Sequence, residues 1–434
     1  MKNYASEILE YVYKKIFGEE TTPLIRSFIR DFQVVAIGSG IGTFLGLIFQ
    51  VLAGRILGPS EYGLFSLVQS VAMFLYVPML LGFNTAMVKY NSEKEDIGRQ
   101  TRIISTAFII VISLTVISSA LYFLFRSHFV RMFSVSDNLF YLAIIFAVLF
   151  TLYTIATEIV RSLFKMKILA ICQFAYPTIM LSVFLLFVLT KPILSFKSVV
   201  YSTFFAYGAV SIVLLTVFLR KYLKLSFSKE WAGTLSKYSL FALTGVISCA
   251  IYANIDKILI NKYMTTTDLG IYKAYYLSSI NLAGLFSMAF NMVFFPTASK
   301  YENKRMLFHK INKLVPYIIV IGLPLILVCE FVILKFYGKQ YYLNPLWLIL
   351  FAIAGIIVVI DGLYGWFFNS ISNKGVGLTA FAAAVLASVN FGLNFILIPL
   401  IGIAACVVSV IISFAICITI ELLLGKRYLL GYHK

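Results

Sequence analysis

Long apolar segments separated by short polar connections dominate the pattern of hydrophobic and polar positions along this chain. Each segment has about 20 residues or more, the length that an α-helix needs to cross the hydrocarbon core of a bilayer. We therefore expect an all-α polytopic membrane protein with about twelve transmembrane helices. The expected spans are residues 32–54, 64–83, 103–125, 139–160, 168–189, 198–219, 238–260, 269–295, 314–336, 345–368, 376–398 and 402–424.

The composition agrees with lipid as the solvent of most of the chain. Hydrophobic residues make up 61% of it and charged residues 12%, whereas a soluble domain carries about 25% charged residues. The first 23 residues differ from the spans, because apolar residues recur there at helical spacing among charged ones. We expect residues 1–23 to form an amphipathic segment on the membrane surface, with a frayed tail as the alternative.

The net charge of +18 is distributed unevenly between alternate connections. One set of connections, which includes both termini, holds more than twice as many of the 36 lysine and arginine residues as the other set. Because cytoplasmic connections carry the excess of basic residues, we expect a multi-pass protein of the cell membrane with both termini in the cytoplasm. The basic charge then indicates orientation and attraction to anionic membrane lipids, and not a nucleic-acid partner.

One short motif occurs twice, about half the chain length apart. Residues 55–66 read RILGPSEYGLFS, and residues 263–273 read YMTTTDLGIYK. At an offset of 207 residues, Gly63 falls on Gly270. Because each motif follows the first span of six, we expect two parallel six-helix bundles, one over residues 24–225 and one over residues 226–434. Parallel repeats place a transport path between the two halves.

The repeated motif has the features of a connector between helices. Gly58-Pro59 predicts a turn, and Thr266 or Thr267 is the expected N-cap in the second copy. Gly63 and Gly270 would let two helices approach closely, because glycine has no side chain to separate them. We therefore expect the motif to define the architecture and not a chemical site.

Four segments carry a resemblance to a known family. They read LAGRILGPSEYGLFSLVQSV (52–71), GFNTAMVKY (82–90), YANIDKILINKYMTTTDLGIYKAYYL (252–277) and FYGKQY (336–341). The chain resembles the polysaccharide biosynthesis flippases, the O-antigen-type members of the multidrug/oligosaccharidyl-lipid/polysaccharide exporter superfamily. The resemblance implies two six-helix bundles forming a V, and export of a lipid-linked oligosaccharide from the inner to the outer face. It implies no role for an individual residue, because the family lacks a short catalytic motif.

Basic residues near the expected cytoplasmic end of span 139–160 form a first candidate substrate site. Arg161 and Lys165 could contact a substrate diphosphate, since a guanidinium donates paired hydrogen bonds to phosphate oxygens. Glu158 would orient Arg161, and Lys89 and Arg102 from a neighbouring connection could join them. The alternative is a plain helical ion pair between Glu158 and Arg161.

A second candidate group lies on the expected outer side. The same offset aligns Lys257 with Gln50 and Lys262 with Arg55, so these four side chains could converge where the halves meet. Asp256 is expected to pair with another span and not with Lys257, because adjacent helix residues do not face each other. The alternative for both lysines is that they snorkel to the outer headgroups.

Three further acids lie in the expected spans of the second half. Asp361 is the deepest, and a buried carboxyl there could couple transport to a proton or another cation. A hydrogen bond that packs two helices is the alternative for Asp361. Glu330 and Glu421 lie near span ends and are expected to be solvated.

These observations favour a flippase that moves a prenyl-diphosphate-linked oligosaccharide by alternating access, for assembly of a cell-surface polysaccharide or glycan. The alternative is a cation-coupled multidrug exporter of the same superfamily, whose cavity would carry carboxylates and few bases. We do not expect an enzyme, because the longest outer connection is too short to hold a catalytic site. No cofactor or metal is expected, since a Walker motif and CxxC spacing are lacking. A glycan polymerase or glycosyltransferase could be a further partner.

Single cysteines test the expected orientation. In a variant without native cysteines, Glu230→Cys should resist a membrane-impermeant maleimide added to intact cells, and Ser195→Cys should react. The two positions lie in connections on opposite sides of the membrane in the expected topology, and a gel shift reports the labelling. Reaction at position 230 in intact cells, at equal expression, would reverse the orientation.

Overall fold

The computed structural model describes residues 23–190, 194–224, 226–288, 294, 298, 303–371 and 373–430, with side chains from residue 40 onward except at 241, 373 and 427–430. The described residues form helices and connections without a strand, which confirms the expected all-α class. The expected amphipathic segment, residues 1–23, lies outside the described residues except for Pro23, where the first described helix begins.

The described part of the first half contains seven α-helices and a short π-helix. They are α2 (Pro23–Leu80), α3 (Phe83–Asn91), α4 (Ile97–Leu124), α5 (Arg126–Phe133), α6 (Asp137–Ser162), α7 (Met166–Thr190), α8 (Phe196–Val213) and η1 (Leu214–Phe218). The described part of the second half continues with α9 (Lys229–Tyr263), α10 (Thr266–Tyr276), η2 (Leu277–Asn281), α12 (Lys304–Tyr337), α13 (Pro345–Asn369), α14 (Asn373–Ile401) and α15 (Ile403–Leu430).

These helices account for the expected spans. Ten helices among the described residues are long and apolar enough to cross a membrane. One of them, Gly40–Leu80 of α2, holds two expected spans, which are divided at Gly58 (φ 80°, ψ 167°) just before Pro59. The expected span 269–295 corresponds to α10, η2 and the helical turns that follow up to residue 288. The chain is therefore a multi-pass helical membrane protein.

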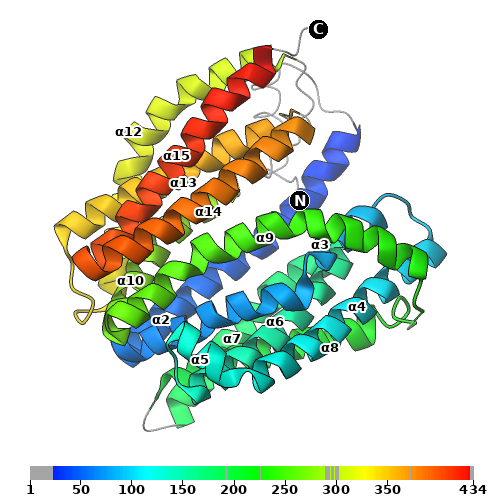
Figure 1. Ribbon diagram of the computed structural model, residues 1–434, viewed down its shortest axis with the longest axis horizontal. Helices are drawn as coiled ribbons and strands as arrows, with labels where there is room; N and C mark the ends of the chain where they lie inside the picture. The colour runs from blue at the N-terminus through cyan, green and yellow to red at the C-terminus, as the bar shows by residue number, and fades with distance from the viewer. Residues whose placement is uncertain are drawn as a thin grey trace, which may run out of the picture.

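Figure 1 shows two groups of helices, with α3 to α8 in one group and α12 to α15 in the other. The long helix α9 lies between them and packs on both. Near its start, the Trp231 ring contacts the Tyr90 ring of α3 at 6.2 Å and lies 5.0 Å from the Arg99 guanidinium of α4. Further along, α9 packs against α14. Division of the bundles at residue 225 stays a prediction, because the beginning of α9 packs on the first group.

The two halves touch backbone to backbone where α2 crosses α10. A methyl group added at Gly63 would lie 1.9 Å from the carbonyl oxygen of Thr266. One added at Gly270 would lie 1.9 Å from the carbonyl oxygen of Pro59. Pro59 and Thr266 are related by the same 207-residue offset as the two glycines, so the contact is symmetric. The expected close approach at both glycines is confirmed.

The connectors differ in detail from the sequence-based expectation. Thr265, and not Thr266 or Thr267, caps α10, and it forms a capping box with Asp268. The carboxylate of Glu61 accepts a hydrogen bond from the backbone nitrogen of Phe196 at 2.7 Å. Glu61 thus ties the second helix of α2 to the beginning of α8, since an acidic group satisfies a free amide at a helix N-terminus.

Alanine at Gly63 or Gly270 should destabilise the fold by about 1–3 kcal/mol, the usual cost of overpacking a close contact. The cause is the added methyl group, which would push apart two backbones that now touch. Thermal unfolding of the purified protein measures the effect. Gly46→Ala is the matched control on α2, because its methyl group would meet nothing within 4 Å. Equal unfolding temperatures for all three variants would contradict the prediction.

Candidate substrate site

Tyrosine hydroxyls join the two bundles beside the α2–α10 crossing. The Tyr62 hydroxyl donates to Gln50 Oε1 at 2.9 Å and lies 3.1 Å from the Tyr337 hydroxyl of α12. The Tyr341 hydroxyl donates to the carbonyl oxygen of Gly54 at 2.9 Å. We call this group of contacts the seam. It closes the space between the bundles at the end where α2 crosses α10.

Arg55 contributes to the rim of the seam. Its guanidinium donates to the carbonyl oxygen of Phe336 at 3.3 Å, and its own carbonyl oxygen accepts from Gln340 at 2.7 Å. The Arg55 side chain is exposed. The structure therefore places Arg55 at the junction of the halves, as expected, but in contact with the backbone of α12.

Lys273 of α10 is a buried lysine in the contact between the halves, and it is not among the residues expected from the sequence. Its side chain is only 6% exposed. The ammonium donates to Gln69 Oε1 of α2 at 3.1 Å and lies 4.1 Å from the Phe65 ring and 4.7 Å from the Tyr62 ring. One feature of the sequence could have identified it: Lys273 follows Gly270 by three residues and therefore shares its helix face.

Lys257 of α9 is the second buried lysine. Its ammonium donates to the carbonyl oxygen of Ala253 at 2.5 Å, lies 3.3 Å from Asp256 Oδ1 and lies over the Tyr276 ring at 4.5 Å. Asp256 also accepts a hydrogen bond from the Tyr272 hydroxyl of α10. The expectation that Asp256 pairs with another span is confirmed for Tyr272. The expectation that it does not pair with Lys257 is wrong, because the long lysine side chain folds back along its own helix.

The two buried lysines have different partners among the described residues. Lys257 and Lys273 are both less than a tenth exposed, and Asp256 is the carboxylate that pairs with Lys257. Lys273 has amide and aromatic neighbours in place of a carboxylate. Buried cations are costly without a partner, and ionisable groups in membrane spans usually mark a substrate or ion pathway. The arrangement can therefore attract an anion.

The four residues of the expected outer group do not all meet. Gln50 reaches the neighbourhood of Lys273 through Tyr62, which contacts both. Lys262 is exposed and lies over the ring of its neighbour Tyr263 at 5.3 Å. Snorkelling thus accounts for Lys262, but it does not account for the buried Lys257.

The expected cytoplasmic group lies on α3, α4 and α6 and on the connection that follows α6. Arg161 and Glu158 form an ion pair of 2.6 Å. Asn91 donates to Ser162 at 2.8 Å and so holds the end of α3 against the end of α6. The Lys89 ammonium lies 4.2 Å from the Tyr238 ring of α9. Both Lys165 and Arg102 are exposed, and a shared substrate site for these residues stays a prediction.

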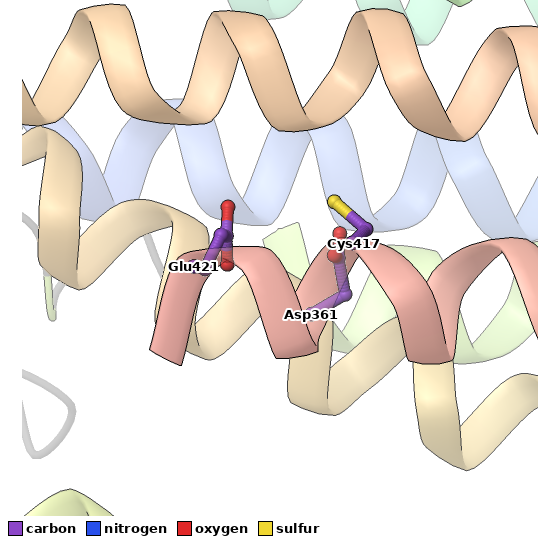
Figure 2. A group of neighbouring side chains, drawn as sticks. All are labelled: Asp361, Cys417 and Glu421. Carbon is purple, nitrogen blue, oxygen red and sulfur yellow. The ribbon is translucent and has the colours of Figure 1, made fainter. Parts of the chain in front are cut away.

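The two acids expected to be solvated are buried. Glu330 is 0% exposed and Glu421 is 2% exposed. Glu421 of α15 lies beside Asp361 of α13 and Cys417 of α15 (Figure 2), where one ligand atom from each residue lies within 4.8 Å of the others. The expectation is wrong because neighbouring helices cover both positions, although each lies near the end of its span.

Solved structures with the same fold are membrane transporters. An inward-facing multidrug resistance MATE family transporter of the MOP superfamily aligns at a TM-score of 0.68 and 12% identity, over 90% of this chain and 95% of that one. The lipid II flippase MurJ, in an inward closed conformation, aligns at 0.67 and 16% identity, over 90% of this chain and 87% of that one. The MATE multidrug transporter DinF-BH aligns at 0.64 and 14% identity, covering 92% and 96%. The chain thus has the fold of the MOP-superfamily transporters.

Its sequence defines the family more narrowly. Residues 51–343 match the polysaccharide biosynthesis protein family. Since this match spans more than half of the chain, the protein belongs to that family, and the resemblance seen in the sequence is confirmed. No curated protein matches the sequence.

Proposed function

We propose that this protein is a flippase that moves a prenyl-diphosphate-linked oligosaccharide from the inner to the outer leaflet of the cell membrane by alternating access. The product would serve assembly of a cell-surface polysaccharide or glycan, with a polymerase or glycosyltransferase as a further partner. Family membership and the MOP-superfamily fold support this proposal. The single observation that carries the substrate class is the pair of buried lysines, Lys257 and Lys273, of which only Lys257 pairs with a carboxylate, that of Asp256.

The physical requirement is compensation of the diphosphate charge. A charge at the centre of a bilayer costs roughly 3 kcal/mol on insertion scales, and a diphosphate carries more than one. Lysine side chains between the bundles can offset that cost only for anions, because a bound anion favours their protonated form. In the proposed cycle, Arg161 and Lys165 contact the diphosphate near the inner face. Lys257 and Lys273 receive it below the seam, and the seam then opens toward the outer face.

The second candidate function, a cation-coupled multidrug exporter, has one observation in its favour. Asp361 lines a cavity of about 290 Å³ in the second bundle, together with aromatic residues such as Tyr252 and Tyr276. A carboxylate beside aromatic rings suits an organic cation. The two functions predict opposite substrate charge. Reconstituted protein tests them directly, with a prenyl-diphosphate-linked oligosaccharide in one set of vesicles and a fluorescent organic cation in the other.

Alanine at Arg161 or Lys257 should lower transbilayer movement of the oligosaccharide at least several-fold, and the double variant should lower it further. Each change removes a positive charge that offsets the diphosphate along its path. Glutamine at the same positions should restore little, because it retains hydrogen-bond donors but no charge. A glycosidase added outside reconstituted vesicles measures the oligosaccharide that has crossed.

Lys262→Ala is the matched control for this experiment. Lys262 lies on the same helix as Lys257 but is exposed, so its removal should leave the rate unchanged. All variants are compared at equal protein content in the vesicles. A double Arg161→Ala, Lys257→Ala variant that moves the oligosaccharide at the parental rate would refute the site. Movement of the organic cation alone would favour the exporter.

A further inference from the structure

Two carboxyl groups and a thiol meet inside the second bundle, apart from the buried lysines. Figure 2 shows Cys417 and Glu421 projecting from α15 one helical turn apart, with Asp361 reaching from α13 toward the Cys417 sulfur. One oxygen of each carboxyl and the sulfur lie within 4.8 Å of one another. Asp361 is half-buried and lines the 290 Å³ cavity, whereas Glu421 is 2% exposed and lies behind it.

Both carboxyls have an oxygen that finds no hydrogen-bond partner. These atoms are Asp361 Oδ1 and Glu421 Oε2. Gly365 of α13 faces the second carboxyl, because a methyl group added there would lie 3.5 Å from Glu421 Oε1. A buried carboxyl oxygen without a hydrogen-bond partner calls for an explanation, and an exchangeable proton supplies one.

The titratable groups around the pair are acidic or neutral among the described residues. Cys417 of α15 and Tyr252 of α9 face Asp361, and Tyr276 of α10 lines the same cavity. Lys374 of α14 and Lys313 of α12 are exposed. No described basic side chain of this set is therefore buried beside the carboxyls to balance their charge.

Two carboxylates so close together in a buried site cannot both be ionised at modest cost, and a shared proton removes the repulsion. We propose that Asp361 and Glu421 form a carboxyl pair that holds one exchangeable proton. The Cys417 thiol donates to the Asp361 carboxylate while the proton resides on Glu421. The proton leaves from Glu421 to Asp361 and then to water in the cavity, which leaves the pair with one additional negative charge.

One side chain separates this pair from the candidate substrate site. Tyr276 lines the cavity of Asp361, and its ring also lies 4.5 Å from the Lys257 ammonium. An anion bound at Lys257 would favour the protonated pair, and by linkage the protonated pair would favour the anion. This coupling rests on the proposed function, whereas the proton on the pair does not.

Infrared difference spectroscopy of the full-length protein in lipid nanodiscs, between acidic and alkaline pH, tests the pair without any substrate. The wild type should show a C=O stretching band of a protonated carboxyl that disappears as the pH rises. Asp361→Asn and Glu421→Gln should each remove that same band, because the proton belongs to the pair. Glu330→Gln is the matched control. Glu330 is also buried without a hydrogen-bond partner, but its removal should leave the band in place.

Three results would overturn the inference. The first is a band that survives in both variants, and the second is a band lost only in Glu330→Gln. The third is a response to Na⁺ at constant pH and ionic strength that Glu421→Gln abolishes, which would assign the site to a metal cation. Size-exclusion profiles establish folding, and either variant alone decides the question. Because no oligosaccharide is present, failure of the flippase proposal would leave this result unchanged.

Discussion

The crossing of α2 and α10 at Gly63 and Gly270 is the contact on which the remaining arrangement depends. Backbone touches backbone there, and the 207-residue offset relates both sides of the contact. Because no side chain separates the helices, residues on the same helix faces are forced into the junction between the bundles. Tyr62 directly precedes one glycine, and Lys273 follows the other by one helical turn. The glycines themselves carry no chemistry, but they bring a hydroxyl and an ammonium group into a space that lipid does not reach.

The seam that this crossing supports is polar for a contact inside a membrane protein. The hydroxyls of Tyr62 and Tyr337 share a hydrogen bond, and the Tyr341 hydroxyl donates to the carbonyl oxygen of Gly54. A single hydrogen bond contributes about 1 kcal/mol net when water is the alternative partner. Water or a sugar hydroxyl can replace these bonds, so the junction can open at modest cost. An apolar junction of the same area would expose hydrocarbon to water on opening, at a cost that grows with the area exposed.

Much of the fold could be predicted from the sequence, because lipid leaves the backbone few choices. Every apolar run of sufficient length has to be a helix, and Gly63 and Gly270 indicated the crossing. The rotation of each helix about its axis could not be predicted in this way. Lys273 was therefore not recognised as a buried residue, and Glu421 was expected to be solvated because it lies near the end of a span. Both are buried because neighbouring helices cover them. The order of hydrophobic and polar residues along one helix does not show which other helix packs against it.

Tyr276 lies between Lys257 and the cavity lined by Asp361 in the second half. Lys273 contacts α2 of the first half, the carboxyl pair lies inside the second bundle, and Tyr276 both contacts Lys257 and lines the acidic cavity. Lys257 belongs to α9, which packs on both bundles, whereas Tyr276 belongs to α10, which crosses α2. Any rocking of the bundles that shifts α9 against α10 must change the distance between this ammonium and this ring. The electrostatic potential that Lys257 produces at the carboxyl pair would then change as well. A movement that shifts α9 against α10 would therefore also change the electrostatic surroundings of the carboxyl pair.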